Sequence, residues 1–118
     1  MKITKEVNLM LTLPIKKKWF DMILSGEKKE EYREIKDYWT NRFCHYLRGT
    51  VVYNFDIIRS GYVIFKNGYS KDAPQIKCFV DCYKGYGREY WGAEPNKLYY
   101  VLKILSVERV ESDVKLEN

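Results

Sequence analysis

The spacing of the apolar residues changes near the middle of the chain, and this change limits the fold more than any other feature. In the first half, Ile15, Trp19 and Ile23 recur every four residues, which is typical of one face of a helix. In the second half, apolar and polar residues alternate, as in residues 76–82, which is typical of a half-buried strand. The two periods together predict an α+β domain with one core.

The order of these segments predicts the pattern β-α-β-α-β-β-β. Residues 50–60 stay ambiguous, because they fit a strand or the approach to one. The third strand should lead into a turn at the pair Asn67-Gly68, and the last strand is expected to bend near Ser106. The predicted strands cover residues 7–13, 28–35, 62–69, 76–82 and 98–110, and the predicted helices cover 15–26 and 37–49.

Four residues mark the ends of the predicted helices. Pro14 cannot donate to a strand ladder and suits the first turn of a helix, so it is expected to end the first strand. Asp37 is expected to cap the start of the second helix. Gly26 and Gly49 are expected to close the two helices, Gly26 in the left-handed conformation.

The length and composition predict one folded domain. The chain has 118 residues, of which 46% are hydrophobic and 31% charged, so burial can offset chain entropy. We expect the domain over residues 1–112 and a polar tail over 113–118. The amino-terminal segment has no long apolar run, so neither a signal peptide nor a membrane span is expected, and the predicted location is cytoplasmic.

The cysteines point to a reducing compartment and to no metal site. Cys44, Cys78 and Cys82 make an odd count, which does not suit a disulfide framework. Cys78 and Cys82 alternate with Val80 on one predicted strand, which favours a core face. His45 is the only histidine, so no second Cys/His pair completes a zinc pattern, and no metal or cofactor is expected.

The charge and the aromatic content favour an anionic partner. The formal net charge is +5, and aromatic residues make up 16% of the chain, with 11 tyrosines. A basic chain of this kind is compatible with a phosphate-bearing partner, although the charge can also serve solubility alone.

One short stretch, S-G-E-K-K-E-E-Y-R at residues 25–33, gathers charges of both signs. Glu31 and Arg33 are two apart, so they share one face of a strand, and the guanidinium would hold the carboxylate in its ionised form. Strict alternation puts Lys29 on this face and Lys28 on the other. Lys28 lies at the turn before the strand, where alternation need not hold, so both lysines remain candidates.

These side chains suit two kinds of chemistry. In a binding site, Lys28 and Arg33 would contact phosphate or base acceptors, and Glu31 would accept a hydrogen bond from an exocyclic amine. In an enzyme, Lys28 would act as base or nucleophile with Glu31 as its partner. A third interpretation is structural, because mixed charges on an edge strand prevent pairing with other chains.

The pattern Gly26-x-Lys28-x-x-Glu31-x-Arg33, directly behind a helix that begins L-P-I-K-K-K-W-F, resembles the hallmark of the ASCH domain family, within the PUA-like superfamily. The later segments V-I-F-K-N-G-Y and L-Y-Y-V-L-K-I-L-S-V-E-R-V are similar to the family's middle and closing strands. The resemblance implies a PUA-like small mixed β-barrel with flanking helices. It also implies a cleft that the motif lines, and RNA or a nucleotide or nucleoside as the partner.

The same resemblance implies a possible hydrolase. One branch of the family removes the acetyl group from acetylated cytidine, and its catalytic lysine matches Lys28. Its second catalytic residue is a threonine at the position of Glu31, so this chain departs from that branch. Other members resemble ribonucleases, for which His45 is the only imidazole here, although its neighbours Phe43 and Tyr46 favour a structural role. A protein-interaction module without nucleic acid is a third alternative.

The segment 83–96 interleaves aromatic rings with cations between glycines. Tyr86, Arg88 and Trp91 are the candidate ligand-binding residues in this predicted loop, because bases stack on rings while cations pair with phosphates. The alternative is a loop that covers one end of the barrel. Trp19 is a further candidate for stacking, with a core position as its alternative. The sequence predicts no oligomeric state.

Overall fold

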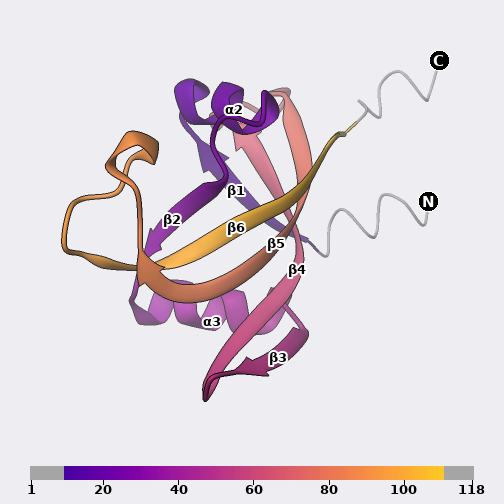
Figure 1. Cartoon of the computed structure of the whole chain (residues 1–118). Helices are drawn as coiled ribbons and strands as arrows, with labels where there is room; N and C mark the ends of the chain where they lie inside the picture. Colours follow the sequence, from indigo (N-terminus) through magenta and orange to yellow (C-terminus); the bar gives the residue numbers. More distant parts are fainter. Residues whose placement is uncertain (1–9, 111–118) are drawn as a thin grey trace.

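The computed structural model describes residues 10–110 as a small α+β domain, in which one curled mixed sheet forms a half-barrel that carries two helices (Figure 1). The α+β class and the barrel-like sheet agree with the sequence prediction. The strands are β1 (Leu11–Ile15), β2 (Glu30–Glu34), β3 (Gly49–Tyr53), β4 (Asp56–Asn67), β5 (Gln75–Tyr86) and β6 (Leu98–Arg109), and the helices are α2 (Lys17–Leu24), α3 (Asp37–Tyr46) and the short 3-10 helix η1 (Glu89–Trp91).

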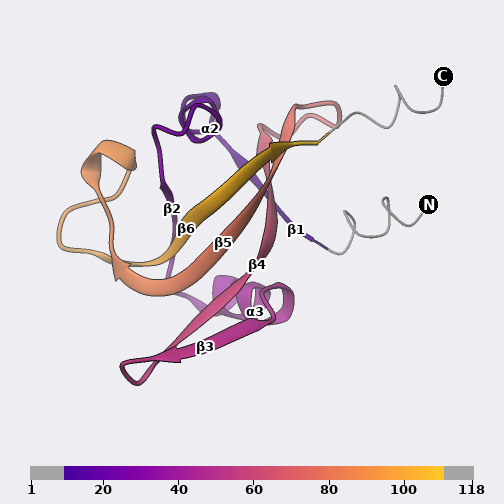
Figure 2. The same cartoon turned by 45° about the vertical axis from the view of Figure 1, so that its right-hand side comes forward.

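The sheet has the order β1-β4-β5-β6-β2, and β3 pairs only with β4. The β1–β4 pair is parallel and the other pairs are antiparallel. The three middle strands β4, β5 and β6 have 12 residues each, and their curl brings β2 round toward β1 (Figure 2). Strands of this length twist strongly, which explains the curl. Helices α2 and α3 lie at opposite ends of the curled sheet (Figure 1).

The core lies inside this curl. The alternation predicted for residues 76–82 is confirmed, because Ile76, Cys78, Val80 and Cys82 are all buried there. The predicted bend near Ser106 coincides with a β-bulge. Phe79 of β5 pairs with Ser106 of β6, whereas the next residue, Val80, pairs with Ile104. One extra residue is therefore left on β6.

Three predictions about the helix ends are wrong. Pro14 lies inside β1. A proline is tolerated there because β1 is an edge strand, and the backbone groups on its outer side pair with no other strand. Lys36, with no side-chain hydrogen bond, occupies the cap position expected for Asp37. Gly49 begins β3, since α3 already ends at Tyr46. Gly26 is as predicted, with a positive φ of 86° directly after α2.

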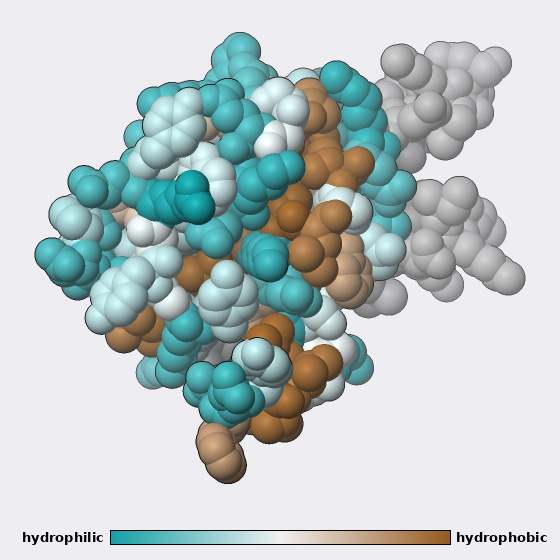
Figure 3. All heavy atoms as spheres, in the orientation of Figure 1, coloured by the Kyte–Doolittle hydropathy of each residue, from teal (hydrophilic) through white to brown (hydrophobic). Residues whose placement is uncertain are grey.

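The ambiguous residues 50–60 form a hairpin of β3 and β4. Tyr53 pairs with Asp56, so Asn54 and Phe55 make a two-residue turn, and both have positive φ. This is the geometry of a type I′ turn, in which asparagine is common but phenylalanine is not. The hairpin exposes apolar side chains, and Figure 3 shows apolar residues gathered at this end of the molecule.

Two further predictions fall partly or wholly outside residues 10–110. The first predicted strand, 7–13, begins outside the described residues, and the polar tail 113–118 lies outside them altogether. Between residues 10 and 110, no helix is long and apolar enough to cross a membrane.

We expect the free energy of unfolding to fall as the pH rises from about 9 to 12. Burial raises the pKa of the Cys78 and Cys82 thiols from an ordinary 9.0 to about 12. The unfolded chain therefore releases these protons first. The stability that the neutral thiols contribute is complete below pH 9 and is lost as the pH approaches 12. Urea unfolding at a series of pH values measures this loss.

The double variant Cys78→Val/Cys82→Val should lose less stability than the wild type over the same pH window. Burial also raises the pKa of Tyr32, but this residue is present in both proteins, so the difference isolates the thiols. Cys44→Val is the matched control, because Cys44 is exposed. An alkaline loss that is equal in the double variant and the wild type would contradict the prediction.

Candidate functional site

The turn between α2 and β2 places Lys28 in the interior. After Gly26, the Lys28 backbone N–H donates to the Met22 carbonyl at 2.9 Å, which folds the chain back against the helix. β2 begins only at Glu30, so Lys28 is not bound by strand alternation. The Lys28 side chain is buried, with 1% exposed, whereas Lys29 is exposed. Of the two candidate lysines, the structure places Lys28 with the rest of the motif.

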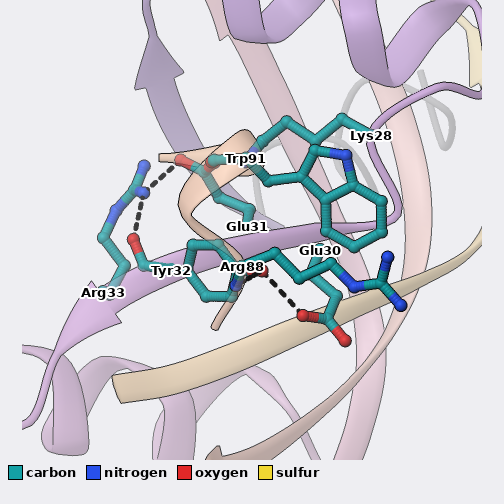
Figure 4. Close-up of polar contacts among 7 residues, drawn as sticks. All are labelled: Lys28, Glu30, Glu31, Tyr32, Arg33, Arg88 and Trp91. Carbon is teal, nitrogen blue, oxygen red and sulfur yellow. Dashed lines mark hydrogen bonds and ion pairs between the residues drawn. The ribbon is translucent and has the colours of Figure 1, made fainter. Parts of the chain in front are cut away.

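Glu31 lies between two cations. Its Oε1 is 3.2 Å from Lys28 Nζ, and its Oε2 accepts a hydrogen bond from Arg33 Nη1. Arg33 also donates to the Tyr32 carbonyl at 2.8 Å. Figure 4 shows Glu31 and Arg33 pointing toward each other. Glu31 is only 6% exposed, so the network is shielded from water and its charges act at close range.

Lys28 sits among aromatic rings and a carbonyl. Its Nζ lies 4.7 Å from the Trp19 ring centroid and 5.0 Å from that of Tyr32. It also donates a hydrogen bond to the Trp91 carbonyl, which belongs to a distant part of the chain. Burial lowers the pKa of Lys28, while the neighbouring Glu31 carboxylate acts in the opposite direction.

The segment from 87 to 97 packs as a loop over β2. The Tyr32 hydroxyl accepts from the Arg88 N–H at 2.9 Å, and the Tyr90 hydroxyl donates to Glu27. A side chain at Gly87 would collide with the Tyr32 ring, since an added Cβ would lie 2.5 Å from it. The loop is shorter than predicted, because β5 continues to Tyr86.

The candidate stacking residues differ in how far they are exposed to solvent. Trp91 is buried, with 9% exposed, and its indole nitrogen has no hydrogen-bond partner among residues 10–110. Arg88 lies outside, with its guanidinium carbon 4.9 Å from the Trp91 ring centroid. Tyr86 is 67% exposed, so its ring is free to contact a partner. Trp19 is half-buried and packs against the core as well as against Lys28.

Two cavities adjoin the sheet. Lys28 lines a cavity of about 200 Å³ next to the β6 bulge. A second cavity, of about 670 Å³, opens between α3 and the β3–β4 hairpin. Neither Lys28, Glu31 nor Arg33 lines this larger one. Sequence reasoning missed it, because its residues come from five separate elements and only the folded sheet brings them together.

The remaining chemical candidates lie apart from the network. His45 is exposed on α3, and its ring stands edge-on to Tyr46. Cys78 and Cys82 belong to the core. Within residues 10–110, no three His, Cys, Asp or Glu side chains are grouped so that they could hold a metal ion.

Comparisons of the chain with protein-family models, with curated proteins and with solved structures found no match.

We expect Glu31→Gln to lower the free energy of unfolding by about 3–5 kcal/mol, the cost of leaving buried charge without its counter-ion. Lys28→Met removes one cation but leaves Glu31 paired with Arg33, so its cost should be smaller. Urea unfolding at neutral pH measures both. Lys29→Met is the matched control and should change the free energy by less than about 0.5 kcal/mol. A larger loss in Lys28→Met than in Glu31→Gln would show that the carboxylate does not organise the network.

Proposed function

We propose that the chain is an ASCH-type domain of the PUA-like superfamily and that it binds RNA or a nucleotide or nucleoside. The motif supports this assignment, since the buried Lys28 and Glu31 form one network with the partly buried Arg33 at the start of β2. The curled mixed sheet with two helices is compatible with a small barrel of that type. The net charge of +5 favours a polyanionic partner.

The observation that carries the proposal is the link between the motif and the loop. Lys28 donates to the Trp91 carbonyl, and the same loop presents Arg88 and Tyr90 to solvent, next to the exposed Tyr86 at the end of β5. Tyr86 and Tyr90 are 67% and 65% exposed, on either side of the exposed Arg88. Exposed rings beside a cation are what single-stranded nucleic acid binding requires, because bases stack and phosphates pair.

The buried network then has a supporting role in binding. Both oxygens of Glu31 are already occupied by Lys28 and Arg33, so the carboxylate holds the site in shape and does not face the ligand. Rigid support of this kind reduces the ordering cost that a ligand must offset on binding.

We expect the double variant Tyr86→Ala/Arg88→Ala to bind a labelled single-stranded RNA at least roughly tenfold more weakly than the wild type. One lost stacking contact costs about 1–3 kcal/mol, and a factor of ten corresponds to about 1.4 kcal/mol. Arg88→Ala alone should reduce the slope of log affinity against log salt by about one. Fluorescence anisotropy at several salt concentrations measures both quantities.

Tyr69→Ala/Lys71→Ala is the matched control, because it removes an exposed tyrosine and an exposed lysine from the turn between β4 and β5. Its affinity should stay close to that of the wild type. Equal losses in the two double variants would mean that charge alone attracts the RNA. An absence of salt-dependent RNA binding by the wild type would favour the protein-interaction alternative.

A second candidate function is hydrolysis at the same site, which one observation favours. Lys28 is buried beside a carboxylate, and burial lowers its pKa, which favours the neutral amine that a base or nucleophile must supply. The closed contact between Lys28 and the Trp91 carbonyl means that the loop must move to admit a substrate.

If the chain is a hydrolase, Lys28→Met should slow the release of acetate from acetylated cytidine by a factor of roughly 10²–10⁴, the usual contribution of a general acid or base. Mass spectrometry of the nucleoside measures the rate. Lys29→Met should retain the wild-type rate, since this lysine is exposed. Equal rates in Lys28→Met and the wild type would exclude Lys28 from the chemistry.

A further inference from the structure

The cavity of about 670 Å³ is separate from the motif network. It opens between α3, the β3–β4 hairpin and the neighbouring part of β5 and β6, and Figure 2 shows α3 and the hairpin side by side. Its volume lies within the range of roughly 300–1,000 Å³ that is usual for small-molecule sites. The cavity is partly open to solvent, and a ligand in it would contact three different walls.

Aromatic rings make up much of its lining. Phe43 of α3 and Tyr100 of β6 meet edge to face, with their ring centroids 5.3 Å apart. Tyr53 contributes from the hairpin. Rings from three sides favour a ligand that carries a planar ring of its own, because ring faces and edges attract one another beyond simple burial.

Two cations of adjacent strands also line the cavity. Arg59 comes from β4 and Lys84 from β5, and neither forms an ion pair with a carboxylate of residues 10–110. The only hydrogen bond of the Arg59 side chain to the described residues is a long one of 3.4 Å to the Leu47 carbonyl. Asp56 is the only acidic residue in the lining, so positive charge is in excess. This excess is complementary to an anion.

We propose that this cavity binds a small organic anion with a planar ring, whose ring packs against the aromatic walls and whose oxyanion pairs with Arg59 and Lys84. The site does not depend on the proposed RNA binding, since it shares no residue with the motif or with the exposed loop. Two sources supply this chemistry, the phosphate of a mononucleotide and the carboxylate of an aromatic acid.

Cys44 provides a readout inside the cavity. It lines the cavity and is exposed, whereas Cys78 and Cys82 are buried. Iodoacetamide, which is uncharged, should therefore alkylate Cys44 alone in the folded protein. A ligand in the cavity should slow this alkylation, and the dependence of the rate on ligand concentration yields a dissociation constant. Mass spectrometry identifies the labelled cysteine, and labelling of the buried pair would reveal an unfolded variant.

The experiment compares two anions with their neutral counterparts: adenosine 5′-monophosphate with adenosine, and 1-naphthoate with 1-naphthylmethanol. We expect at least one anion to protect Cys44 and its neutral counterpart to protect it at least roughly tenfold less well, which is the effect of one lost charged hydrogen bond. Protection by the nucleotide alone identifies a phosphate ligand, and protection by naphthoate alone identifies an aromatic carboxylate.

Arg59→Gln and Lys84→Gln should each weaken protection by the effective anion roughly tenfold, with protection measured relative to the alkylation rate of the same variant without ligand. Lys71→Gln removes the same charge outside the cavity and should leave protection intact.

The proposal is overturned if no anion protects Cys44, if the neutral counterparts protect equally well, or if Lys71→Gln weakens protection as much as Arg59→Gln. The RNA assay on the same variants separates the two sites. A variant that loses protection of Cys44 but still binds RNA is impaired in the cavity alone.

Discussion

The arrangement of β2 depends on a single carboxylate that serves two cations. Glu31 is buried, and its two oxygens contact Lys28 and Arg33 separately. A buried charge is tolerated only when it is paired and hydrogen-bonded, so the position of each of the three groups requires the other two. Lys28 extends the constraint to the Trp91 carbonyl, which ties residues 87–97 to the end of α2. The turn before β2 therefore holds a loop that lies about sixty residues further along the chain.

Neighbouring residues of β2 and β6 face opposite sides of the sheet. Glu31 and Arg33 pair with Leu102 and Tyr100, on the face that α3 and the core cover. Tyr32 pairs with Val101 on the other face, where the loop with Trp91 covers them. The outer face thus has a small apolar layer of its own. Lys28 precedes the strand and contacts groups of both faces, which explains how a lysine becomes almost wholly buried.

Local patterns predicted much of the fold and part of the site. Alternation identified the buried face of β5, and the spacing of Glu31 and Arg33 placed them together correctly, because both depend only on strand geometry. Alternation failed for Lys28, whose position depends on the turn after Gly26. Pro14 was wrongly predicted to end the first strand, because an edge strand cannot be recognised before the sheet order is known. The hairpin was missed because Phe55 is an unusual residue for a turn that requires positive φ.

The large cavity shows why some sites cannot be predicted from one segment. Arg59 and Lys84 are separated along the chain, and neither belongs to a recognisable motif. They approach because β4 and β5 are antiparallel neighbours, with Arg59 opposite Cys82, two residues from Lys84. Tyr100 joins them because it lies opposite Lys84 on β6. Its neighbour Tyr99 points to the other face and accepts a hydrogen bond from the loop N–H of Glu94 at 3.0 Å. A single strand thus forms one wall of the cavity and the base of the aromatic loop, and the alternation of its side chains keeps the two surfaces apart.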